Sequence, residues 1–169
     1  MRYLYSLATL MLLVLLQGTL LPLAVPWLPL NPALLFLVFL SFRLQQRSQF
    51  LAAALWAGLV QDILFGEILG LFMLTSFIAA AVIWELKEGF LDNPVLTCGL
   101  RLIIATLIQE LLIAFIFYIR GLEPNNLGHV LQVQAGLSLA GNLLLYFLVL
   151  AWLGLGGSQR IAAALEAKE

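Results

Sequence analysis

The stretch from Val95 to Ile119 reads VLTCGLRLIIATLIQELLIAFIFYI and contains only two charged residues, Arg101 and Glu110. An α-helix needs about 20 predominantly apolar residues to cross a bilayer core roughly 30 Å thick. This stretch meets that requirement without a proline or a cluster of charges. It therefore predicts a membrane-spanning helix, and with it a fold that is built in lipid.

The composition of the whole chain agrees with this prediction. Of its 169 residues 63% are hydrophobic and 10% are charged, and the mean hydropathy is +1.07. Soluble domains usually carry roughly 25% charged residues. A chain of this length has room for about five to seven membrane crossings with short loops, and none for a separate catalytic domain. We predict an all-α membrane protein.

Six apolar segments follow one another along the chain and predict about six transmembrane helices. They are expected near residues 3–21, 28–42, 50–65, 68–84, 95–119 and 130–155. The first resembles a signal sequence, but its apolar run is too long for one, so we interpret it as an uncleaved first helix. We expect a single transmembrane helical bundle over residues 1–157 and a short cytoplasmic tail over residues 158–169.

The second segment has the weakest helical pattern of the six. Pro29 and Pro32 restrict its start, and the part from Leu30 to Phe42 would rise only about 20 Å as a helix. It is either a short tilted helix or a re-entrant one. Because proline is tolerated in a first helical turn, we expect the helix to start near Asn31 or Pro32.

The positive charges predict the orientation in the membrane, because cytoplasmic loops carry the excess of Lys and Arg. With six spans, six of the basic residues fall on one side. They are Arg2, Arg43, Arg47, Lys87, Arg160 and Lys168. This distribution predicts that both termini are cytoplasmic, and it requires the second segment to cross.

Several functional classes are not supported by the sequence. A net charge of −1 with scattered basic residues gives no basic stripe for nucleic acid. Cys98 is the only cysteine, so an intrachain disulfide is excluded, and the single histidine, His129, lies in a predicted loop. Nucleophile, metalloprotease and phosphate-binding motifs are missing. We expect no enzymatic activity, no cofactor and no metal site.

Polar residues inside the predicted spans are the functional candidates, because burying them in lipid is costly. They are Asp62, Arg101, Gln109, Glu110 and Asn142. Arg101 lies roughly 10 Å from the inner surface and so is not expected to pair with Asp62 in the outer half. One interpretation is hydrogen bonding between helices. The other is a polar cavity, open to the outer side and lined by Asp62, Glu110 and Asn142, that binds a partner segment or a small solute.

Residues 58–74 read GLVQDILFGEILGLFML and contain the pattern G-L-x-x-D-x-x-x-G-x-x-L-G-x-x-x-L. Gly58 and Gly70 would permit close helix packing and Gly66 a tight turn. Asp62, held near that turn, would accept hydrogen bonds from the amides that start the next helix, from about Glu67 onward.

This pattern resembles the signature of the MreD family of bacterial rod-shape-determining proteins. The chain length, the six-span plan, the Asn31-Pro32 start of the second helix and Asn142 in the last helix also fit that family. The family often has proline before Asp or Asn at the second helix, and often a proline after the Asn of the last helix, and this chain has neither. These departures concern the roles of single residues.

The resemblance implies a scaffold in the cytoplasmic (inner) membrane rather than a catalyst. Proteins similar to MreD associate with MreC and help to localise or activate RodA with its class B penicillin-binding protein, and these partners supply the chemistry. The family is also thought to share its helix arrangement with the S components of energy-coupling-factor vitamin transporters. The alternative hypothesis is therefore a small-solute binding subunit of an ATP-driven transporter.

Overall fold

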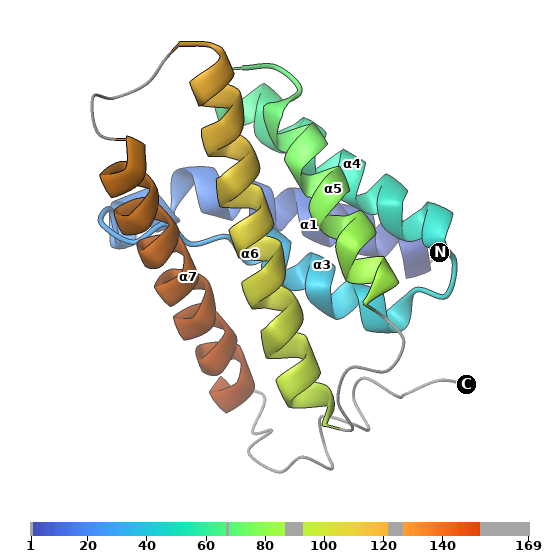
Figure 1. The fold of residues 1–169 in the computed structure, drawn as a ribbon. Helices are drawn as coiled ribbons and strands as arrows, with labels where there is room; N and C mark the ends of the chain where they lie inside the picture. The colour runs from blue at the N-terminus through green and yellow to red at the C-terminus, as the bar shows by residue number, and fades with distance from the viewer. Residues whose placement is uncertain (1, 67, 87–92, 122–126, 153–169) are drawn as a thin grey trace.

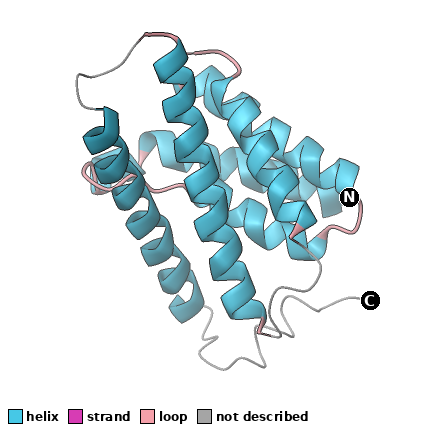
Figure 2. Cartoon of the chain, in the orientation of Figure 1, coloured by secondary structure: helices cyan, strands magenta, loops and turns pink. Residues whose placement is uncertain are grey.

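The computed structural model describes residues 2–66, 68–86, 93–121 and 127–152. Within these residues the chain forms only helices and connections, with no strand (Figure 2). The helices are α1 (Arg2–Thr19), α2 (Leu21–Ala24), α3 (Pro32–Arg43), α4 (Arg47–Phe65), α5 (Leu71–Glu85), α6 (Pro94–Ile119) and α7 (Leu127–Trp152). The predicted tail over residues 158–169, the end of the last predicted span and the basic residues Lys87, Arg160 and Lys168 lie outside the described residues.

The all-helical membrane class predicted from the sequence is confirmed. Among the described residues, three helical stretches are long and apolar enough to cross a membrane, namely Tyr3–Ala24, Val95–Ile119 and Val133–Trp152. The helices α3 and α5 are apolar but shorter. Each of the six apolar segments overlaps most of one helix of at least 12 residues, so hydropathy located the helices.

The short helix α3 lies at the centre of the bundle (Figure 1). It contacts α1, α4, α5, α6 and α7, while the outer helices pack mainly on their neighbours in the order α1, α4, α5, α6, α7. Most of its side chains are therefore buried. The segment with the weakest helical pattern thus forms the core of the fold.

The helix of the second predicted segment is shorter than the apolar run near residues 28–42. It begins at Pro32 after the N-cap Asn31, whose φ is −120°. Pro29 and Pro32 explain the difference, because each fixes its own φ and disfavours a helical conformation in the residue before it. The helix start that the sequence predicted, near Asn31 or Pro32, is confirmed.

Small side chains bring α4 and α5 close together. Ala53 and Ala57 of α4 and Ala79 and Ala80 of α5 are all 0–1% exposed. In lipid, where apolar burial gives no net gain, such residues let helices associate through close packing. The two helices form an antiparallel hairpin, with an ion pair of 2.7 Å between Arg47 and Glu85 joining its open end.

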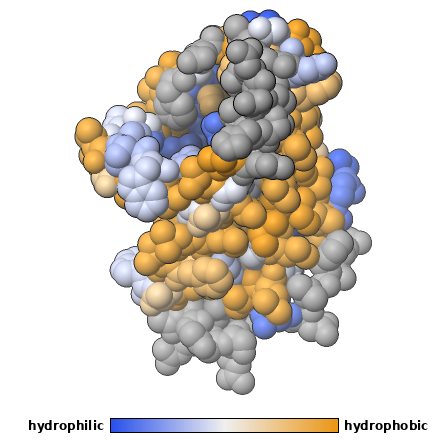
Figure 3. Space-filling model, turned by 60° about the vertical axis from the view of Figure 1, so that its left-hand side comes forward, coloured by the Kyte–Doolittle hydropathy of each residue, from blue (hydrophilic) through white to orange (hydrophobic). Residues whose placement is uncertain are grey.

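The outer surface of the bundle is largely apolar. Large hydrophobic side chains are exposed on α1, α6 and α7, among them Leu12, Leu111 and Phe147, each 61–63% exposed. Figure 3 shows one such face, on which hydrophilic residues gather in a hollow near one end. Apolar surface of this extent suits contact with lipid.

Candidate functional site

The sequence pattern over residues 58–74 builds the closed end of the α4–α5 hairpin. Asp62, in the last turns of α4, places both carboxylate oxygens on the first amides of α5. Oδ1 accepts a hydrogen bond of 2.9 Å from the N–H of Phe72, and Oδ2 accepts one of 3.0 Å from the N–H of Met73. The expected bonds from Asp62 to the start of the next helix are therefore present.

The start of α5 favours a negatively charged cap such as Asp62. The first amides of a helix have no partner within the helix, and the N-terminal end carries a partial positive charge. Within α5 the N-cap residue is Gly70, which has no side chain to accept those bonds. Asp62 is 3% exposed, so its negative charge is held by the amides and the helix dipole in place of water.

The glycines of the pattern have different roles from those predicted, except for Gly58. A Cβ on Gly58 would lie 2.5 Å from the Cα of Met73, so close packing of the two helices does require glycine there. A Cβ on Gly70 would meet no described atom within 4 Å, so close packing does not require glycine there. Gly70 instead adopts a φ of +91°, which few other residues tolerate. Gly66 has a φ of −76°, but a Cβ would lie 2.7 Å from the carbonyl oxygen of Asp62.

A second polar cluster holds the start of α3 inside the bundle. The backbone N–H of Asn31 donates to Oδ1 of Asn142 at 2.8 Å, and its Nδ2 donates to Oε1 of Gln109 at 3.1 Å. Its Oδ1 accepts from the N–H of Leu34 at 2.9 Å, as an N-cap does. Through its backbone N–H and its side chain, Asn31 thus joins α3, α6 and α7.

The cluster continues through hydroxyl groups on two helices. Gln109 Nε2 donates to Oγ of Ser76 at 3.2 Å, and Asn142 Nδ2 donates to Oγ1 of Thr106 at 3.0 Å. Thr106 in turn donates to the carbonyl of Leu102 at 2.8 Å. The cluster therefore holds α3, α5, α6 and α7 together, which agrees with the interpretation that intramembrane polar groups bond between helices.

The proline-rich connection between α2 and α3 is largely exposed on the bundle and has few backbone donors to satisfy. Proline has no N–H, so Pro26 and Pro29 remove two groups that would be costly in lipid without partners. The connection also touches α7 closely, since a Cβ on Gly141 would lie 2.8 Å from the carbonyl oxygen of Pro29. Gly141 and Asn142 together fix the connection to α7.

Beside this connection lies a polar cavity of about 350 Å³. Its polar lining comes from α1, α3, α6 and α7 and consists of Gln17, Asn31, Thr106, Gln109, Glu110, Gln134, Ser138 and Asn142. The hydroxyl oxygen of Ser138, a residue only 3% exposed, lies beside Glu110 and accepts no hydrogen bond from the described residues.

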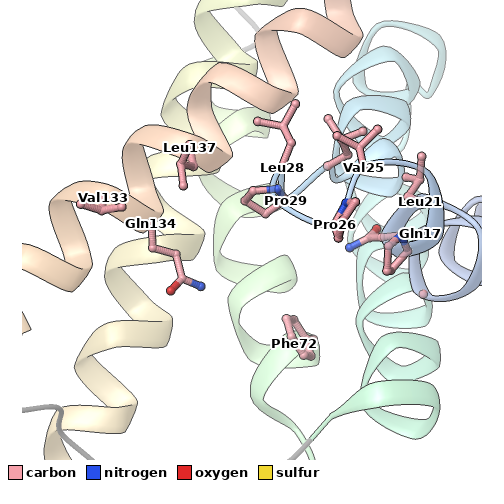
Figure 4. Close-up of a pocket in the computed structure, with 13 residues that line it drawn as sticks. Gln17, Leu21, Val25, Pro26, Leu28, Pro29, Phe72, Val133, Gln134 and Leu137 are labelled. Carbon is pink, nitrogen blue, oxygen red and sulfur yellow. The ribbon is translucent and has the colours of Figure 1, made fainter.

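An apolar cavity of about 690 Å³ adjoins the polar one (Figure 4). The two share Gln17, Pro29, Leu30, Phe72 and Gln134 as lining residues. In Figure 4, Gln17 of α1 and Gln134 of α7 lie on opposite sides of the space, with the prolines of the connection between them. Helices α1 and α7 make no direct contact among the described residues, so this space separates them.

Of the three residues expected to line a polar cavity, Glu110 and Asn142 line the one found here, whereas Asp62 lines neither cavity. Both oxygens of Asp62 are used in capping α5, and Asp62 does not line either cavity. Arg101 lies elsewhere, donating to Oγ of Ser41 at 3.2 Å and to the carbonyl of Leu86 at 3.0 Å, with its guanidinium 4.3 Å from the centre of the Phe42 ring. It does not pair with Asp62, as expected.

Sequence reasoning missed several residues of this region, chiefly Gln17, Gln61 and Ser138. Gln61 is 2% exposed, and its Nε2 donates to Oε1 of Gln17 at 3.5 Å. A signal was available: Gln17 and Gln61 are polar residues inside predicted spans, and Ser138 precedes Asn142 by one helical turn.

The described residues contain no group of three His, Cys, Asp or Glu side chains that could hold a metal ion. A family model described as rod shape-determining protein MreD matches residues 1–155. Neither the curated proteins nor the solved structures give a match.

Proposed function

Because this chain belongs to the MreD family of rod-shape-determining proteins, we propose that it acts as a non-catalytic membrane scaffold of the cell-elongation machinery. Membership places it in rod-shape determination as a multi-pass membrane protein. The finer proposal is that it binds MreC and helps to localise or activate RodA with its class B penicillin-binding protein. On this account the partners perform peptidoglycan synthesis.

The observation that carries the non-catalytic role is the use made of Asp62. An aspartate within a spanning helix is a natural candidate for proton transfer or nucleophilic attack. Here both of its oxygens accept hydrogen bonds from the α5 amides at 2.9 and 3.0 Å. A carboxylate engaged in this way stabilises a helix end and is not free to act on a substrate.

We also propose the membrane arrangement. The six main helices cross the inner membrane of a bacterium with both termini in the cytoplasm, as a single bundle over residues 1–157. The turn between α3 and α4, which carries Arg43 and Arg47, is then cytoplasmic, and the turn between α4 and α5 is on the outer side. The distribution of Lys and Arg supports this orientation.

A second candidate function is supported by one observation, the polar cavity beside Glu110. A cavity of about 350 Å³ is within the size range of small-molecule sites. The chain could therefore be a solute-binding subunit of an ATP-driven transporter, like the S components that bind vitamins.

Depletion of the chain in its own host separates the two candidates. The scaffold role predicts that rod-shaped cells become round while vitamin supplements have no effect. The transporter role predicts normal shape, with growth that depends on the missing solute. A depleted strain that stays rod-shaped would contradict the scaffold proposal.

A further inference from the structure

The polar and apolar cavities together form a space with two different halves. The polar half lies between α6 and α7 near Glu110 and Ser138. The apolar half lies between the α2–α3 connection and α7, and is lined by aliphatic residues and prolines. Such a division suits a molecule with a polar group at one end and a hydrocarbon part at the other.

The chemistry of the polar half favours a positively charged group. Among the described residues that line the two cavities, Glu110 is the only ionisable one, and none is Lys or Arg. Its carboxylate, half-buried on α6, is a costly charge in a membrane bundle unless a cation pairs with it. The described lining offers no such cation.

The number of acceptors points to a primary ammonium group. Ser138, on the helix that faces Glu110 across the cavity, places a buried hydroxyl beside the Glu110 carboxylate, and its oxygen accepts no hydrogen bond from the described residues. Gln134, one helical turn before Ser138, adds a carboxamide oxygen. A primary ammonium has three N–H donors, which the oxygens of Glu110, Ser138 and Gln134 could accept.

The apolar half lies between α1 and α7, two helices that the proposed arrangement places in the membrane. Helix α1 packs on α3 and α4, and α7 packs on α6 and α3, so α1 and α7 leave a gap between them in the described structure. The side chains along this gap include Leu21, Val25 and Leu137, which can contact a hydrocarbon chain.

We infer that the two cavities bind an amphiphile that carries a primary ammonium group, with the ammonium beside Glu110 and Ser138 and the hydrocarbon part in the apolar half. The amphiphile is either an aminophospholipid of the surrounding membrane or a free long-chain amine. This binding is separate from the scaffold role and needs no partner protein.

The test uses the full-length protein, purified in detergent, and native mass spectrometry. The probes are phosphatidylethanolamine, phosphatidylcholine with the same acyl chains, phosphatidylglycerol, and dodecylamine. Phosphatidylethanolamine is expected to bind about tenfold more tightly than phosphatidylcholine, because the trimethylated ammonium has no N–H to donate and one hydrogen bond to a charged group is worth about that factor. Binding of dodecylamine as well as the lipid indicates that a free amine can enter, and binding of the lipid alone indicates a bilayer source.

Substitutions assign the binding to this cavity. Glu110→Gln keeps the size of the side chain and should weaken binding of phosphatidylethanolamine about tenfold, without changing that of phosphatidylcholine. Ser138→Ala should give a smaller loss. The matched control is Glu85→Gln, which changes an exposed acid at the open end of the α4–α5 hairpin and outside both cavities. It should not change the binding of phosphatidylethanolamine.

Three results would overturn the inference. They are equal affinity for phosphatidylethanolamine and phosphatidylcholine, preference for the anionic phosphatidylglycerol, and ammonium binding that survives Glu110→Gln. If Glu110→Gln fails to fold, Ser138→Leu provides the same test, because it fills the cavity with an apolar side chain and should abolish binding.

Discussion

Replacing Asp62 with alanine removes the carboxylate that caps the first amides of α5. In Asp62→Ala the N–H groups of Phe72 and Met73 lose acceptors at 2.9 and 3.0 Å. Gly70 cannot replace them, because it has no side chain. The closed end of the α4–α5 hairpin should therefore open, and the whole bundle should lose stability.

The size of this loss follows from the two hydrogen bonds. One N-cap contributes about 1 kcal/mol through a single amide, and hydrogen bonds to charged groups contribute about 1.5–3 kcal/mol. Bonds between helices in a bilayer average only about 0.6 kcal/mol, because the unfolded state in lipid also finds partners. For two bonds to one buried carboxylate we expect a loss of about 2–3 kcal/mol.

Thermal unfolding of the purified protein in one detergent measures this loss. A change of that size should lower Tm by about 5–10 °C for a chain of this length. Asp62→Asn keeps one carbonyl oxygen and should lose less. The control Glu85→Ala breaks only an exposed ion pair, worth about 0–1 kcal/mol. If Asp62→Ala unfolds at the same temperature as Glu85→Ala, the capping argument is refuted.

The remaining predictions concern close contacts and the cluster at the start of α3, and the same unfolding assay checks each of them. Gly58→Ala should prevent normal packing of the hairpin, because the new Cβ would lie 2.5 Å from the backbone of α5. Gly136→Ala, its control within a helix, meets nothing within 4 Å and should leave Tm unchanged or slightly raised. Gly141→Ala should lower Tm, since its Cβ would lie 2.8 Å from the backbone of the proline-rich connection; a Tm equal to that of Gly136→Ala would contradict this. Asn142→Leu should cost about 1–3 kcal/mol because it leaves the N–H of Asn31 buried without an acceptor, and an unchanged Tm would show that this bond contributes nothing.

Hydropathy predicted the helices because a bilayer requires long apolar segments, and that requirement is visible in the sequence. It did not predict which face of each helix is buried. In a soluble helix the apolar stripe marks the buried face, but here lipid and protein neighbours are equally apolar, so the stripe is missing. The rotation of α6 that brings Gln109 to Asn31, 78 residues earlier in the chain, could not be derived from spacing.

The candidate residues were predicted better by local chemistry than by long-range placement. The capping role of Asp62 was predictable, because the next helix starts only a few residues later. The position of Asp62 relative to the cavity was not predictable, because it depends on the direction of the side chain. The turn role of Gly70 was not predictable either, because the sequence marks Gly66 and Gly70 alike as turn or packing glycines and only the backbone angles distinguish them.

Gentle purification of the tagged protein from its native membrane, followed by mass spectrometry of everything that accompanies it, tests the scaffold account most directly. The account predicts recovery of an MreC-like protein and of cell-wall synthases, and recovery of neither from cells that express Asp62→Ala, with normal recovery from the Glu85→Ala control. Recovery of an ATP-driven transport partner and a vitamin-like solute, without any cell-wall protein, would contradict it.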